Sequence, residues 1–69
     1  MKEVKIHTEF ITLGQFLKLA DFVSGGGEAK MIIMDGLVQV NDEIDTRRGR
    51  KLYPGDVVTF NGESCRVGK

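Results

Sequence analysis

The stretch "TRRGRK", residues 46–51, places four cationic side chains within five consecutive positions. Arginine predominates among them, and its planar guanidinium group can donate paired hydrogen bonds to a phosphate or stack on a base. Gly49, in the middle of the stretch, lets the backbone turn or approach a ligand closely. These residue types favour binding of a polyanion, and a solvated surface loop is the simpler alternative.

A second candidate for anion binding is the stretch "SGGGEAK", residues 24–30. Glycines at the start of a helix leave backbone N–H groups accessible at the positive end of the helix dipole, which suits a phosphate group. Lys30 would lie one turn into this helix and add a cation. The alternative is that the three glycines only form a tight or flexible connection between two helices.

No group of residues indicates catalysis or a metal site. His7 is the only histidine and Cys65 the only cysteine, and most of the chain separates them. A lone cysteine in a predicted strand is most often a small hydrophobic residue, and it cannot form an intramolecular disulfide. The acids Asp42, Glu43 and Asp45 surround a predicted turn and are interpreted as a solvated face. We therefore expect no enzymatic activity, no cofactor, no metal and no small-molecule substrate.

The formal net charge of zero hides a strong asymmetry along the chain. Residues 1–46 carry four lysines against eight acids, and residues 47–69 carry six cations against two acids, so these parts have net charges of −4 and +4. Salt limits the reach of a surface charge to about 10 Å, so a ligand responds to the local charge. A neutral protein is therefore compatible with an anionic partner.

The length of 69 residues suffices for one domain, so residues 1–69 are predicted to form a single unit. The longest apolar runs, such as "MIIM", have four residues or fewer, far short of the ~20 that a membrane-spanning helix needs. The first ten residues lack a secretory hydrophobic region. We expect a cytoplasmic location without membrane association.

A first helix is predicted from Leu13 to Asp21 or Phe22. Thr12 and Gln15 have the spacing of a capping box, in which each side chain accepts from the other residue's backbone N–H. The apolar stripe of this helix consists of Leu13, Phe16, Leu17 and Ala20. Lys18 lies opposite the stripe and should face solvent.

A second helix is predicted at about residues 27–35, ending at Gly36, and short strands follow it. Two-residue turns at Asn41-Asp42 and Asn61-Gly62, and a type II turn in "YPGD", separate these strands. "EVKI", residues 3–6, fits an edge strand at the N-terminus. The predicted fold is α+β, with two helices packed on a small, mostly antiparallel sheet of four to five short strands.

The order of these motifs, from residue 11 to residue 58, resembles the S4-like RNA-binding domain, also called the alpha-L motif. The order is a capped helix, a glycine turn, an "EAK" helix, "DG", "VQVN", a basic connection and "KLYPGDVV". The whole chain is similar to the small stand-alone bacterial members of that family, which are regarded as RNA- or ribosome-associated. The core of the motif corresponds to residues 11–58.

The resemblance implies a non-catalytic protein that recognises structured RNA, such as ribosomal RNA or RNA in ribosomal particles, through phosphate contacts. The residues expected to contact RNA are Lys18, Ser24, Gly25, Gly26, Gly27, Lys30, Arg47, Arg48, Arg50 and Lys51. The chain departs from the family pattern at the start of the first helix, where the usual arginine-leucine-aspartate is Thr12, Leu13 and Gly14. It also has Gly26 in place of a common arginine and Gln39 in place of a basic residue. The arginines of "TRRGRK" compensate for the basic residues missing from these positions.

Two other functions fit parts of the sequence. The acidic first part of the chain could dock a basic protein partner, as an assembly adaptor that does not bind RNA, and exposure of Met31 or Met34 would favour this. "LYPGDVVTF" also resembles the end of ubiquitin-like sulfur carriers. Such carriers need a C-terminal Gly-Gly, whereas this chain ends in "VGK".

Overall fold

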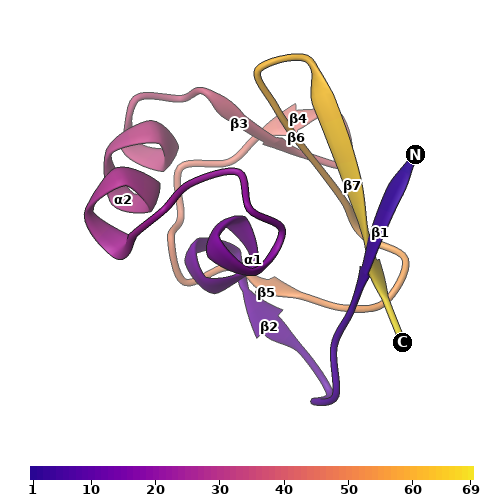
Figure 1. The fold of residues 1–69 in the computed structure, drawn as a ribbon. Helices are drawn as coiled ribbons and strands as arrows, with labels where there is room; N and C mark the ends of the chain where they lie inside the picture. The colour runs from indigo at the N-terminus through magenta and orange to yellow at the C-terminus, as the bar shows by residue number, and fades with distance from the viewer.

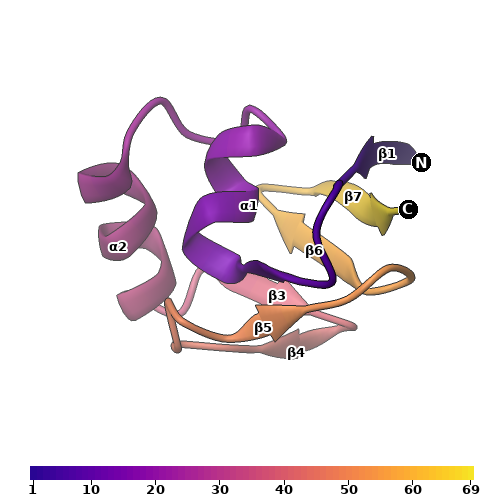
Figure 2. The same cartoon turned by 90° about the horizontal axis from the view of Figure 1, so that it is seen from below.

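The computed structural model describes all 69 residues and contains two helices and seven strands (Figure 1). The helices are α1 (Leu13–Leu19) and α2 (Gly26–Met34). The strands are β1 (Lys2–Lys5), β2 (Ile11–Thr12), β3 (Val38–Val40), β4 (Glu43–Ile44), β5 (Lys51–Leu52), β6 (Val57–Phe60) and β7 (Glu63–Gly68). The two helices lie side by side and pack on one side of the strands (Figure 2). The predicted α+β fold is confirmed.

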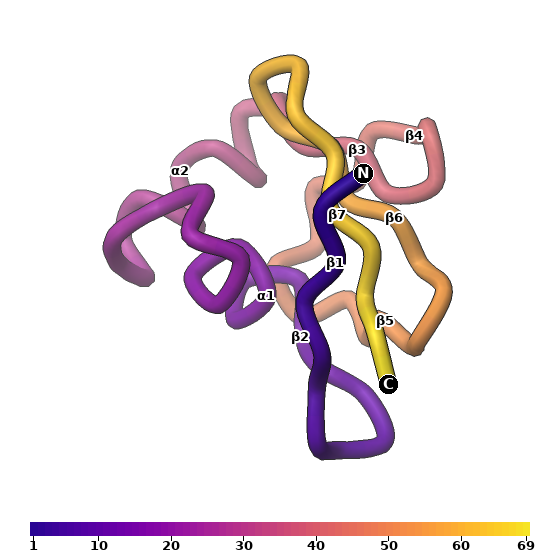
Figure 3. Tube along the Cα trace, turned by 45° about the vertical axis from the view of Figure 1, so that its right-hand side comes forward, coloured from indigo at the N-terminus to yellow at the C-terminus, as the bar shows by residue number.

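The main sheet has five strands in the order β1-β7-β6-β3-β4. Its pairs are antiparallel except that the edge strand β1 runs parallel to β7 (Figure 3). The turns Asn41-Asp42 and Asn61-Gly62 have positive φ at both positions, as a type I′ hairpin turn requires. The predicted hairpins are therefore confirmed, and the N-terminal strand runs over Lys2–Lys5 instead of residues 3–6.

A second, two-stranded sheet was not predicted from the sequence. β2 and β5 pair antiparallel, with Ile11 opposite Leu52 and Thr12 opposite Lys51. Lys51 therefore lies on a strand and not in the connection to which the sequence analysis assigned it. Each strand has only two residues, too few for a periodic pattern to be recognised. This pairing holds the residue before α1 against the end of the "TRRGRK" stretch.

Helix α1 begins where predicted, with Thr12 and Gln15 in the capping-box arrangement. The backbone N–H of Thr12 donates to Gln15 Oε1 at 3.5 Å. The helix ends at Leu19, earlier than predicted, because Asp21 takes a left-handed φ of 63°. Lys2 of β1 donates its Nζ to the Ala20 carbonyl oxygen at 2.6 Å, so the sheet satisfies one of the carbonyl groups at this helix end.

Helix α2 begins and ends one residue earlier than predicted. Gly36 lies just beyond its end with a φ of 74°. The N–H groups of Gly36 and Leu37 donate to the carbonyl groups of Ile33 and Ile32, which is the Schellman pattern. Gly36 thus ends the helix as the sequence indicated.

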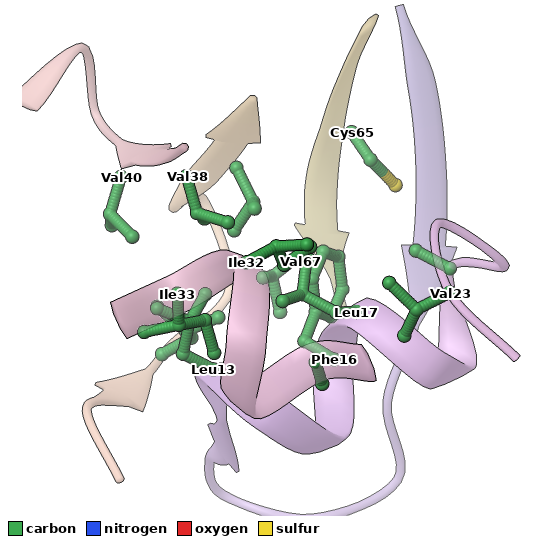
Figure 4. Packing of buried hydrophobic residues seen from close by; sticks show 14 of the residues in the cluster. Leu13, Phe16, Leu17, Val23, Ile32, Ile33, Val38, Val40, Cys65 and Val67 are labelled. Atoms are coloured by element: carbon green, nitrogen blue, oxygen red, sulfur yellow. The ribbon is translucent and has the colours of Figure 1, made fainter. Parts of the chain in front are cut away.

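The core lies between the helices and the main sheet (Figure 4). The residues of the predicted stripe of α1 are each no more than 1% exposed. Ala29, Ile32 and Ile33 of α2, together with Val38 and Val40, are each no more than 7% exposed. Cys65 on β7 is fully buried, and burial raises the pKa of its thiol. Its predicted role as a small core residue is confirmed. Neither helix has the length and apolar character needed to cross a membrane.

Candidate nucleic-acid interface

A polar pocket of about 200 Å³ opens between α1, α2 and the segment that joins β4 to β5. We call that segment, residues 45–50, the basic loop. The pocket is lined by Thr12, Gly14, Gln15, Lys18, Gly26, Ala29, Arg48 and Gly49. Lys18, Gly26 and Arg48 are far apart in the sequence, and the fold brings these predicted contact residues to one site.

Gly14 allows the basic loop to approach α1 closely. Its backbone N–H donates to the Arg48 carbonyl oxygen at 3.0 Å, and the neighbouring Leu13 N–H donates to the Arg50 carbonyl oxygen at 2.8 Å. A Cβ atom at position 14 would lie only 2.8 Å from Arg48 Cγ. The first turn of α1 therefore donates its free N–H groups to the loop, and the Arg48 side chain lies across Gly14.

The pocket combines two cations with the start of a helix. Lys18 Nζ lies 3.9 Å from the position that a Cβ of Gly26 would occupy, so the amine reaches the first residue of α2. The N–H groups of Gly26, Gly27 and Glu28 belong to the first turn of α2 and have no acceptor within the helix. Lys18, Arg48 and these N–H groups create a positive local field that suits a phosphate group.

The Glu28 side chain accepts hydrogen bonds from Ser24, the first residue of the "SGGGEAK" stretch. Glu28 Oε1 accepts from the Ser24 N–H at 3.1 Å and from the Ser24 hydroxyl at 3.3 Å. The carboxylate therefore occupies the approach to the helix start on the Ser24 side, where the sequence analysis placed a phosphate. Ser24, Gly25 and Gly27 do not line the pocket.

The interpretation of Asp45 as part of a solvated face is wrong. Asp45 is only 6% exposed. It accepts from the Arg47 backbone N–H at 2.9 Å, from Arg47 Nε and Nη2 at 3.0 and 2.8 Å, and from Arg50 Nη1 at 2.8 Å. The hydrogen bonds from Arg47, and then the one from Arg50, hold the pKa of the Asp45 carboxyl well below its usual range although burial opposes them. Asp42 and Glu43 are exposed, as predicted.

Two of the four cations in the basic stretch thus serve the fold. Asp45 forms ion pairs with Arg47 and Arg50, and the Arg50 side chain is 28% exposed. Arg47 keeps 70% of its side chain exposed and can still meet a ligand. Lys51 Nζ lies 4.8 Å from the centre of the Phe10 ring. Arg48 is exposed, forms no ion pair and is the member of the stretch that lines the pocket.

The other predicted basic contact residue, Lys30, is exposed on α2 but does not line the pocket. Five pocket residues were not among the predicted contact residues: Thr12, Gly14, Gln15, Ala29 and Gly49. Thr12 and Gln15 were predicted only as the cap of the first helix. A signal for Gly14 was present, since a glycine inside a helix costs about 1 kcal/mol relative to alanine and calls for a packing reason.

One surface outside the pocket is apolar and acidic, in contrast to the polar, positively charged pocket. Four apolar side chains are more than half exposed: Met31, Met34, Leu37 and Ile44. Ile44 lies against the turn after α2, since its Cγ2 is 3.7 Å from the Cβ position of Gly36. Residues 31–46 contain acids and no lysine or arginine. The exposed acids of this stretch, Asp35, Asp42 and Glu43, give it a charge opposite to that of the pocket.

The potentially reactive side chains lie outside the pocket as well. His7 is exposed in the segment after β1, and Cys65 is buried. The residues form no group of three or more histidine, cysteine or acidic side chains that could hold a metal ion. The chemistry available at the pocket is therefore hydrogen bonding and charge.

Comparison with known proteins shows similarity to one family of proteins. A family model described as an S4 domain matches residues 4–68. The "Probable ribosome maturation protein RlbA" of Bacillus subtilis is 61% identical over 59 residues, which are 86% of this chain and 83% of that protein. The "Putative RNA-binding protein YbcJ" of Escherichia coli is 35% identical over 57 residues, 83% of this chain and 81% of that protein.

Two solved structures share the fold. The solution structure of YbcJ from E. coli, described as revealing an alphaL motif involved in RNA-binding, superimposes with a TM-score of 0.76 and 30% identity. The superposition covers 100% of this chain and 89% of the YbcJ chain. The 30S ribosomal protein S4e from Thermoplasma acidophilum matches 86% of this chain and 31% of that chain, with a TM-score of 0.65 and 30% identity.

Proposed function

The chain belongs to the S4 domain family, and from that premise we propose that it binds structured RNA of the ribosome or of its maturation intermediates. It acts by binding alone and catalyses no reaction. The names of its relatives speak of RNA binding and ribosome maturation. The observation that carries the proposal is the pocket, which joins Lys18, Arg48 and the N–H groups at the start of α2.

The pocket suits the phosphate backbone of a folded RNA. A phosphate oxygen is a hydrogen-bond acceptor, and every group that we assign to the contact is a donor: an ammonium, a guanidinium and backbone N–H groups. Arg47 and Lys51 extend the positive surface beyond the pocket on the side of the basic loop. Lys30 and the glycine turn extend it along α2, and Arg50 contributes charge while it holds Asp45.

RNA binding should depend strongly on salt concentration. Neutralising about four phosphates gives a slope of about −3 for log affinity against log salt, on the single-strand coefficient. Fluorescence anisotropy with structured fragments of ribosomal RNA, measured over a salt series, provides the slope. In parallel, the protein should co-sediment with ribosomal particles and be released by nuclease. Absence of RNA binding at low salt would exclude the proposal.

Gly14→Ala should separate stability from RNA binding. Alanine favours the helix by about 1 kcal/mol, but its methyl group would displace the Arg48 side chain, so we expect the unfolding free energy to change by less than about 1 kcal/mol. RNA affinity should fall about tenfold because Arg48 leaves the pocket. Met31→Ala is the control, since this side chain is exposed on α2 and does not line the pocket. Equal RNA affinities of the two variants would contradict this role of Gly14.

A second candidate function is docking of a basic protein. Met31 and Met34 are 58% and 62% exposed, which favours this alternative, and residues 31–46 contain no lysine or arginine. The co-sedimentation experiment distinguishes the two functions. Attachment that survives complete nuclease digestion would favour protein docking, and release by nuclease favours RNA binding.

A further inference from the structure

An aromatic pair lies at the surface where β2 meets β5. The rings of Phe10 and Tyr53 have centroids 6.0 Å apart and an interplanar angle of 48°. Tyr53 is 44% exposed and Phe10 is half-buried. Lys51 Nζ lies 4.8 Å from the centre of the Phe10 ring. Phe10 therefore packs against Tyr53 and contacts the Lys51 amine, and Tyr53 is the more exposed ring of the pair.

The pairing of β2 with β5 places this aromatic pair next to the pocket. Thr12, which lines the pocket, pairs with Lys51, and Ile11 pairs with the buried Leu52. Phe10 directly precedes Ile11, and Tyr53 directly follows Leu52, so the two aromatic residues lie opposite each other just beyond this pair. Two residues along a strand span about 7 Å, so the pocket, the Lys51 amine and the Tyr53 ring form a short row.

The backbone of Tyr53 is held by the turn that follows it. Its N–H donates to Asp56 Oδ2 at 2.8 Å, and its carbonyl oxygen accepts from the Asp56 N–H at 3.0 Å. Gly55 in this turn has a φ of 101°, as a type II turn requires. An exposed ring with few rotatable bonds on a fixed backbone loses little conformational entropy when another ring stacks on it.

We propose that Tyr53 is a stacking site for an unpaired nucleobase of the RNA whose phosphates occupy the pocket, with the Lys51 amine beside the phosphate of that nucleotide. This inference rests on the proposed function and adds a contact to a base beside the phosphate contacts of the pocket. Bases stack on exposed aromatic rings next to positive grooves without regard to sequence. The site therefore selects RNA with an unstacked nucleotide, such as a loop or a bulge, over continuous duplex.

The test uses the structured ribosomal RNA fragment that binds most tightly in the salt series. Tyr53→Leu keeps an apolar side chain against Phe10 and removes the ring face, so affinity should fall about tenfold, within the range known for loss of base stacking. Tyr53→Phe keeps the ring and should bind within about twofold of the unsubstituted protein. The slope against salt should be the same for all three proteins, because no phosphate contact is lost.

A direct signal is available because Tyr53 is the only tyrosine. In protein labelled with 3-fluorotyrosine, its single fluorine resonance should shift when RNA is added. An unmoved resonance on bound RNA, or full affinity in Tyr53→Leu, would overturn the stacking site and leave the proposed function intact. Failure of the unsubstituted protein to bind any RNA would overturn both. Should Tyr53→Leu not fold, the fluorine signal of the unsubstituted protein still decides the question.

Discussion

Asp45→Asn should lower the free energy of unfolding by about 2–3 kcal/mol, because the amide cannot satisfy the donors that face it. The buried carboxylate accepts four hydrogen bonds from Arg47 and Arg50. The asparagine NH₂ group would instead face guanidinium donors, and the largely covered Arg50 would lose its counter-charge. For a domain of this size the loss corresponds to a fall in Tm of roughly 10–20 °C.

Glu43→Gln is the matched control, since it removes one acid from the neighbouring strand β4, where the side chain is exposed. Exposed substitutions of this kind change stability by about 0.5 kcal/mol or less. Thermal and urea unfolding, monitored by circular dichroism, compare the two variants with the unsubstituted protein. Equal midpoints for Asp45→Asn and Glu43→Gln would show that the Asp45 cluster contributes nothing to stability.

The same cluster predicts how stability depends on pH. Folding lowers the pKa of Asp45, so the unfolded chain binds the proton more readily and acid favours unfolding. The contribution of Asp45 is complete above the pKa of an unfolded aspartate, about 3.9, and is lost as the pH falls towards the lower pKa of the folded state. The stability difference between the unsubstituted protein and Asp45→Asn should therefore be constant from pH 7 to about pH 5 and shrink below about pH 4.

Lys18→Glu/Arg48→Glu should weaken binding of structured ribosomal RNA by about hundredfold or more at about 50 mM salt. Each substitution removes a charge-assisted contact, worth about 1.5 kcal/mol or more, and adds repulsion. Loss of two phosphate contacts should also reduce the steepness of the salt dependence by about 1.4. Both side chains are exposed, so the fold should persist.

Lys5→Glu/Lys69→Glu makes the same change in net charge outside the pocket, on the edge strand β1 and at the last residue. This control should reduce RNA affinity only slightly, because charges beyond about 10 Å are screened. Anisotropy titrations of both double variants against the same RNA give the comparison. Equal losses would mean that RNA responds to the overall charge of the protein and not to the pocket.

Much of the fold follows from local patterns in the sequence. The apolar stripe of α1, the glycine that ends α2 and the Asn-Gly hairpin each depend on residues close together in the chain. Local sterics and hydrogen bonds decide such features, so their residue types reveal them. The predicted strand Glu3–Ile6 was nearly right for the same reason, but its parallel pairing with β7 joins the two ends of the chain and has no local signal.

The sequence by itself determined the two helices, the hairpins and the concentration of positive charge in residues 46–51. Only the tertiary structure decided how that charge is divided. Asp45 is buried and holds Arg47 and Arg50, whereas Arg48 crosses Gly14 and meets Lys18 and Gly26 at the pocket. Burial and long-range contacts set these roles. An arginine beside a buried carboxylate is a structural partner, whereas an arginine beside an open pocket is a free hydrogen-bond donor.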